Sequence, residues 1–221
     1  MAITLLFLVS GSAILDWIAT FKEWRKAEMF AKPTVMILLF AWLYAGTRLH
    51  GALLWFGIGI LFSLMGDVFL LSPDRLFLPG LVAFLFAHIA YIAGFNNEAV
   101  PFDIWDVFLA AMIFLSAIRI LQRLVLALRS KGMNGLILPV EIYGLTISTM
   151  LFFAMRTLVH SNWQAGAAAL VSVGAFLFYI SDIILAWNRF ASPIQNGRLL
   201  NIIAYHLGQI ALIVGAAMHF G

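Results

Sequence analysis

The amino-acid sequence predicts an all-α, polytopic membrane protein, a bundle of eight transmembrane helices. Three observations lead to this prediction. Of the 221 residues, 64% are hydrophobic and 10% are charged, whereas a soluble protein of this size carries roughly 25% charged residues. The mean hydropathy is +1.03. Apolar segments close to the ~20 residues needed to cross a bilayer as a helix follow one another along the whole chain.

The predicted spans leave little chain outside the lipid. We therefore predict one integral-membrane domain over residues 1–221, with its function in the helix bundle or at its rim. The first apolar segment lacks a basic leading region and a small-residue cleavage site, so it is interpreted as a span and not as a removable signal peptide. The eight predicted spans are residues 3–21, 33–49, 52–72, 77–96, 103–126, 136–158, 164–187 and 199–219.

The distribution of Lys and Arg predicts the orientation. Eleven of the 13 lie at the span ends joined by the first, third, fifth and seventh loops, and the other two are Arg48 and Arg156. Because cytoplasmic loops carry an excess of Lys and Arg, we expect these loops in the cytoplasm, both termini outside, and a bacterial inner membrane. Topology accounts for the net charge of +3, so no nucleic-acid partner is predicted. The chain has no cysteine, which excludes disulfides and thiolate metal sites.

Two similar motifs predict an internal repeat. Asp67 and Asp182 stand in similar apolar contexts, and His88 and His206 follow them after 21 and 24 residues. In each half a proline, Pro33 or Pro139, is expected to open the helix after a basic loop. We interpret this as a parallel 4+4 repeat, with halves of approximately residues 1–100 and 101–221.

The two aspartates are the main candidates for function. An ionisable group in a membrane helix is costly and marks a functional site by default. Asp67 and Asp182 each lie five residues before the cytoplasmic end of a predicted span, which is roughly 7 Å at ~1.5 Å per residue. His88 with Tyr91, and Tyr205 with Gln209, share helix faces nearby. We therefore expect a polar cavity open to the cytoplasm.

Less specific interpretations exist for each of these residues. A single membrane aspartate often serves as a hydrogen-bonded packing group, and tyrosines more often pack than react. Lys32 and Arg123 are long enough to reach the interface without a further role. Asp16 and Glu141 are interpreted as groups that neutralise such cations.

Six short motifs together resemble the YhhN family, whose animal members are the TMEM86 lysoplasmalogenases. The resemblance lies in their order and spacing over nearly the whole chain. Two positions depart from the family pattern: Ala31, where Thr is expected, and His206-Leu207-Gly208 before Gln209. The motifs are Lys32-Pro33, Gly66-Asp67, His88-x-x-Tyr91, Pro139-Val140-x-x-Tyr143, Gly174-x-x-Leu177-Phe178-x-x-Ser181-Asp182 and Tyr205-x-x-x-Gln209.

The resemblance implies hydrolysis of the vinyl ether bond of a lysoplasmalogen, a lysophospholipid, without a metal or cofactor. The reaction proceeds by protonation of the β-carbon to an oxocarbenium ion, which water captures. That chemistry needs one acid and one carboxylate, and we assign these roles to Asp67 and Asp182 as a pair. Lys32 and Arg123 are predicted to hold the phosphate. Six side chains are predicted to orient the pair or the water: His88, Tyr91, Tyr143, Tyr205, His206 and Gln209.

Three other functions are compatible with parts of the sequence. Asp67, Asp182, His88 and His206 have ligand types that suit zinc or another divalent ion, which would make a metal-dependent lipid hydrolase. Membrane carboxylates in parallel repeats also occur in proton-coupled transporters, although the outer halves of the spans hold few polar residues. An intramembrane aspartyl protease is disfavoured, because its paired acids normally lie on adjacent helices.

Overall fold

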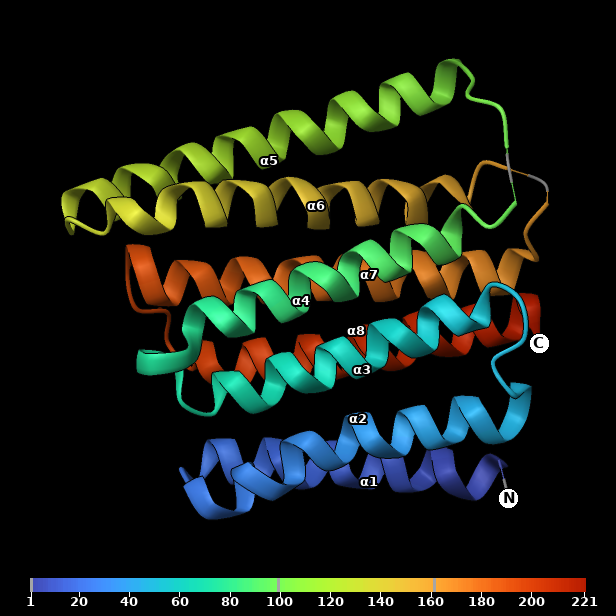
Figure 1. The fold of residues 1–221 in the computed structure, drawn as a ribbon, viewed down its shortest axis with the longest axis horizontal. Helices are drawn as coiled ribbons and strands as arrows, with labels where there is room; N and C mark the ends of the chain where they lie inside the picture. The colour runs from blue at the N-terminus through green and yellow to red at the C-terminus, as the bar shows by residue number, and fades with distance from the viewer. Residues whose placement is uncertain (1, 99, 161) are drawn as a thin grey trace.

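The computed structural model describes residues 2–98, 100–160 and 162–221 and confirms the all-α membrane fold. Within these residues eight helices are long and apolar enough to cross a membrane. A 3₁₀ turn (η1, Asn134–Leu136) precedes α6, and a π-helical turn (η2, Trp187–Ala191) follows α7. The helices in Figure 1 are α1 Ala2–Phe21, α2 Arg25–Thr47, α3 Leu53–Leu70, α4 Pro73–Phe95, α5 Ile104–Ser130, α6 Ile137–Arg156, α7 Ala165–Ala186 and α8 Gly197–Phe220.

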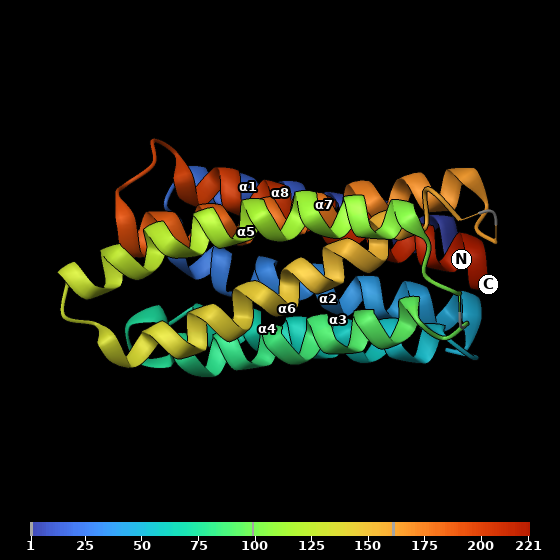
Figure 2. The same cartoon turned by 90° about the horizontal axis from the view of Figure 1, so that it is seen from above.

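Five helices surround the centre of the bundle. Packing runs from α3 to α4, then to α6, α7 and α8, and back to α3. The pair α1 and α2 covers this ring along α3 and α8, while α5 packs on α6 at the other side (Figures 1 and 2). We call the end that carries the α1–α2, α3–α4, α5–α6 and α7–α8 connections the basic end. The 4+4 repeat stays a prediction.

The predicted start of the second span was wrong. We expected Pro33 to open a helix, but α2 begins at Arg25 and contains Pro33 in its interior. The eight residues from Arg25 to Lys32 include Ala, Glu, Met, Arg and Lys, which favour a helix. Pro33 removes one hydrogen bond to the Met29 carbonyl, and the helix continues through it. Pro139 does lie in the first turn of its helix, α6, as predicted.

A buried ion pair joins α5 and α6 at the end opposite the basic end. Arg156 Nε lies 2.7 Å from Asp106 Oδ1, and its Nη2 donates to the carbonyls of Val100 and Pro101 at 3.1 and 2.8 Å. The guanidinium also lies over the Phe102 ring, 4.2 Å from its centroid. These partners explain how an arginine can be 6% exposed in this apolar protein.

Glycines bring α7 and α8 into backbone contact. A Cβ placed on Gly174 would overlap the Leu212 backbone nitrogen, and one on Gly208 would lie 2.8 Å from the Phe178 nitrogen. Backbone atoms in two packed helices cannot move aside for a side chain. Small residues therefore set the separation of these helices, as is common in membranes. This contact fixes α7, with Asp182, relative to α8.

Gly174→Val should destabilise the protein strongly, because its side chain would meet the α8 backbone. We expect a loss of about 3 kcal/mol in the free energy of unfolding, measured by thermal denaturation in detergent. Gly166→Val on the same helix is the matched control, since the nearest neighbour of its Cβ would be Met218 Cε at 3.9 Å. Equal melting temperatures for the two variants would contradict the proposed role of Gly174.

Candidate active site

Asp67 is buried in α3 and has partners from two other helices. Lys32 Nζ of α2 lies 3.2 Å from Asp67 Oδ1, and the Tyr205 hydroxyl of α8 donates to Oδ2 at 2.7 Å. The Asp67 side chain is 1% exposed and that of Lys32 is 14% exposed. The carboxyl group is therefore reached through Lys32 and not directly from outside.

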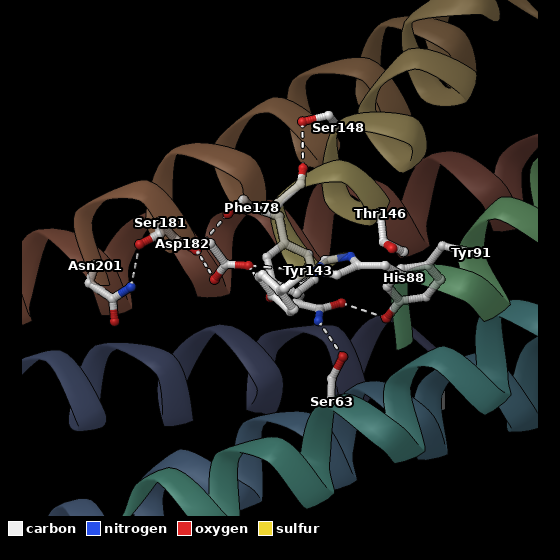
Figure 3. Close-up of polar contacts among 12 residues, drawn as sticks. Ser63, His88, Tyr91, Tyr143, Thr146, Ser148, Phe178, Ser181, Asp182 and Asn201 are labelled. Carbon is white, nitrogen blue, oxygen red and sulfur yellow. Dashed lines mark hydrogen bonds and ion pairs between the residues drawn. The ribbon is translucent and has the colours of Figure 1, made fainter. Parts of the chain in front are cut away.

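Asp182 is bound by a tyrosine and a histidine from the other side of the ring. The Tyr143 hydroxyl of α6 donates to Asp182 Oδ2 through a short hydrogen bond (Figure 3). His88 Nε2 of α4 lies 3.0 Å from the Tyr143 oxygen and 3.5 Å from Asp182 Oδ2. The His88 side chain is fully buried, whereas that of Asp182 is 11% exposed. Asp182 is thus the more accessible of the two carboxyls.

Phe178 lies between the partners of the two aspartates. Its ring centroid is 5.3 Å from that of Tyr205, which binds Asp67, and 4.7 Å from that of His88, which binds Asp182. Within the described residues no hydrogen bond joins Asp67 to Asp182 directly. The two carboxyls therefore lie in one region of the bundle, but on different helices and with different partners.

A second polar group ties the centre of the ring together. Gln209 Nε2 donates to Ser63 Oγ at 2.8 Å, and the Tyr91 hydroxyl donates to Gln209 Oε1 at 2.8 Å. Ser63 and Tyr91 face one another across this amide in Figure 3. Ser63 precedes Asp67 by one helical turn, and Gln209 follows Tyr205 by one turn. The hydrogen bonds Ser63–Gln209 and Asp67–Tyr205 therefore fix the register of α3 against α8.

Some predicted residues do not contact either carboxyl within the described part of the chain. Gln209 and Tyr91 bind one another and not Asp67. His206 Nδ1 accepts a hydrogen bond from Trp17 Nε1 at 3.2 Å, because its side of α8 faces α1. Arg123 is exposed on α5 and lines neither of the cavities at the site.

Two cavities of opposite character meet beside the aspartates. The polar cavity, about 770 Å³ in volume, lies at the basic end. The narrow apolar cavity, about 60 Å³, has Asp182, Tyr143 and Tyr179 as polar residues in a wall of aliphatic and aromatic side chains from α3 to α7 and η2. Leu70, Phe77 and Leu185 line both. The polar cavity is otherwise lined by Thr20, Arg25, Glu28, Met29, Lys32, Leu71, Asn188, Arg189, Gly197, Arg198, Asn201 and Ile202.

Several charged residues of the polar cavity were missed in the sequence. Glu28 and Arg25 lie one and two turns before Lys32 on one face of α2, and Arg198 of α8 binds Glu28 at 2.7 and 2.9 Å. Their spacing of three and four residues is a helical pattern that the sequence does contain. It was overlooked because the predicted span began at residue 33.

Within the described residues, the four predicted metal ligands do not come together at one point. Asp67, Asp182, His88 and His206 do not form a group of donor atoms close enough to hold one ion, as far as the described residues show. A group that does meet this criterion, Asp103, Asp106 and His160, lies at the opposite end of the bundle. There Asp106 is already bound by Arg156 at 2.7 Å.

The fold and site define a polytopic membrane protein with one buried and one partly exposed acid where a polar and an apolar cavity meet. Residues 27–216 match the YhhN family, and the chain belongs to that family. The resemblance found in the sequence motifs is thereby confirmed.

Curated relatives cover most of the chain. It is 31% identical over 201 residues to mouse (Mus musculus) lysoplasmalogenase TMEM86B, covering 90% of this chain and 78% of the relative. Identity to the human (Homo sapiens) TMEM86B lysoplasmalogenase is 29%, covering 88% and 76%. For human lysoplasmalogenase TMEM86A it is 29%, covering 72% and 63%. No solved structure matches.

Gln209→Leu should destabilise the protein without removing a charge. The substitution leaves the buried Ser63 and Tyr91 hydroxyls without their amide partner, and each such loss costs about 1–3 kcal/mol in soluble proteins and less in membranes. We expect a total near 2 kcal/mol, measured by thermal denaturation. Gln122→Leu, at an exposed position on α5, is the control and should melt like wild type. Unchanged melting of Gln209→Leu would refute the role of this amide.

Proposed function

We propose that this protein is a lysoplasmalogenase that cleaves the vinyl ether bond of a lysoplasmalogen. The products are a fatty aldehyde and glycerophosphoethanolamine or glycerophosphocholine. The observation that carries this proposal is the junction of the two cavities, with Asp182 in the wall of one and the Lys32–Asp67 pair beside the other. The names of the relatives, at about 30% identity over most of the chain, support it.

The two cavities suit the two parts of a single-chain phospholipid. A phosphate entering the polar cavity would meet Lys32, Arg25 and Arg198, and charge-assisted hydrogen bonds to phosphate are among the strongest available. The alkenyl chain would lie in the apolar cavity and continue between the helices. The vinyl ether, which joins these parts, then falls near Leu70, Phe77 and Leu185, where the cavities meet.

The aspartate pair supplies the acid and base of the reaction. One carboxyl gives its proton to the β-carbon of the vinyl ether, which leaves an oxocarbenium ion on the α-carbon. Water adds to the α-carbon and gives a proton to the other carboxylate, as in glycosidases by analogy. The hemiacetal then collapses: its hydroxyl proton passes through water to the glycerol oxygen as the bond to that oxygen breaks, which leaves the aldehyde and returns no proton to the pair. Asp67 and Asp182 share these roles.

The neighbours of the pair hold both carboxyls in position. Tyr143 and His88 orient Asp182, while Tyr205 and Lys32 orient Asp67. Tyr91, Gln209 and His206 act at a distance by fixing the helices that carry these partners. Side chains locked by such contacts keep acid and base in a productive geometry.

The basic end is proposed to face the cytoplasm of a bacterial inner membrane. Most Lys and Arg residues lie at its loops, and the polar cavity opens among them. The positive-inside rule then places both termini on the other side. The substrate would enter from the cytoplasmic leaflet.

A panel of lysolipids tests the function together with its residues. Detergent-purified protein should release aldehyde from vinyl-ether lysolipids and nothing from matched alkyl-ether or acyl lysolipids, measured by mass spectrometry. Asp67→Asn and Asp182→Asn should each lower kcat by about 100-fold or more, because each removes an acid–base group.

The matched control is Asp103→Asn, since Asp103 is exposed and caps α5, where Asn serves equally well. This variant should keep wild-type activity. No cleavage of vinyl-ether substrates by the wild type would refute the function. Full activity in both aspartate variants would refute the acid–base pair alone.

Ala186→Phe should obstruct the apolar cavity, because Ala186 lines it where α7 ends. We expect kcat/KM for long-chain vinyl-ether lysolipids to fall at least about tenfold, since the chain loses its apolar contacts. A short-chain substrate should be affected less. Val173→Phe, 52% exposed on the same helix and outside both cavities, is the control. Equal loss for both chain lengths would contradict this placement of the chain.

A further inference from the structure

A third buried carboxyl lies beside the proposed site. Asp16 of α1 is 0% exposed, and neither of its oxygens has a hydrogen-bond partner within the described residues. Thr20 follows it by one turn on the same helix face, and its Oγ1 is likewise without a partner in that part of the chain. Thr20 also lines the polar cavity. Asp16 therefore lies one helical turn behind the cavity wall.

Charged groups from three helices surround Asp16. The charged groups near it are Lys32 and Glu28 of α2, Asp67 of α3 and Arg198 of α8. Trp17, the residue after Asp16, donates to His206 Nδ1 and joins α1 to α8 at this level. The His206 ring then carries its hydrogen on Nε2, which is also buried and unpartnered among the described residues.

A neutralising role for Asp16 does not explain this arrangement. Lys32 already has a carboxylate partner in Asp67 at 3.2 Å. A buried carboxyl without hydrogen bonds is costly to retain, and such groups are usually satisfied by water when the site is polar. The Asp16 carboxyl and the Thr20 hydroxyl together offer the acceptors and the donor that water needs.

The proposed reaction requires the two carboxyls to exchange protons with solvent, and Asp16 is placed to take part in that exchange. In each cycle one carboxyl of the pair loses a proton and the other gains one, so both must be reset. Because no hydrogen bond joins Asp67 to Asp182 within the described residues, each must exchange a proton with solvent. Asp182 is 11% exposed, but Asp67 is only 1% exposed. Asp67 therefore exchanges its proton through neighbouring groups, Lys32 and the residues behind it.

We propose that Asp16 is a proton-relay residue that connects the polar cavity to the Lys32–Asp67 pair through Thr20 and water. One proton enters or leaves Asp67 per turnover along this route, and an equal and opposite exchange with solvent resets Asp182. Asp16 touches neither the substrate nor the reacting bond. This role rests on the proposed function and adds to it a residue outside the aspartate pair.

Chemical rescue tests the relay. Purified Asp16→Ala should lose at least about tenfold in kcat with KM within about twofold of wild type. Added formate, a small carboxylic acid that fits the space left, should restore much of kcat in Asp16→Ala. The same formate should have little effect on Asp67→Asn, whose carboxamide leaves no such space.

Two further variants keep the test decisive. Asp16→Asn is nearly isosteric and replaces Asp16→Ala if that variant does not fold; it should lower kcat and enlarge the ratio of kcat in H2O to kcat in D2O. Ser10→Ala, at an exposed position on α1, should match wild type. Wild-type kcat in Asp16→Ala or Asp16→Asn would overturn the relay, as would a loss that formate does not relieve. An inactive wild-type protein would instead overturn the proposed function.

Discussion

The ion pair between Lys32 and Asp67, together with the tyrosine bound to it, connects three helices. It also takes part in the proposed hydrolysis and in the proposed proton relay. Lys32 comes from α2, Asp67 from α3, and the Tyr205 hydroxyl on the other carboxylate oxygen from α8. Removing one partner of such a pair leaves a buried, uncompensated charge, which typically costs about 3–5 kcal/mol. The pair is also the point where the polar cavity reaches the buried interior. The same three side chains therefore contribute to stability and to the proposed chemistry.

Much of this arrangement could be predicted from the sequence. The apolar segments predict the helices. The sequence motifs also predict five of the side chains at the site: the two aspartates, His88, Tyr143 and Tyr205. Pairing across helices could not be predicted, because the periodicity of one helix does not fix its rotation against a neighbour. His206 shows this limit: its position beside Tyr205 suggested the site, but its face of α8 meets Trp17. Because Pro33 was expected to open the second span, the first turns of α2, which carry Arg25 and Glu28, were not predicted as part of a helix.

The polar groups inside the closed ring of helices lie at different levels along the bundle. Ser63 and Tyr91 are held by Gln209 near the centre, and the aspartates lie closer to the basic end, where η2 widens the end of α7. π-helical turns of this kind frequently occur at functional sites. At the opposite end the buried polar side chains of α5 and α6, Asp106 and Arg156, bind one another. The proposed chemistry thus lies in the half of the bundle at the basic end.

The wall shared by the two cavities has a consequence for how a turnover would end. Leu70, Phe77 and Leu185 separate a space lined by charges from one lined by hydrocarbon. Cleavage at this boundary would turn one amphiphile into two molecules of opposite solubility, each already in the compartment that matches it. The head-group fragment would depart to water and the aldehyde to lipid, so neither would cross the other's path. Such partitioning would draw the reaction forward and limit rebinding of both products together.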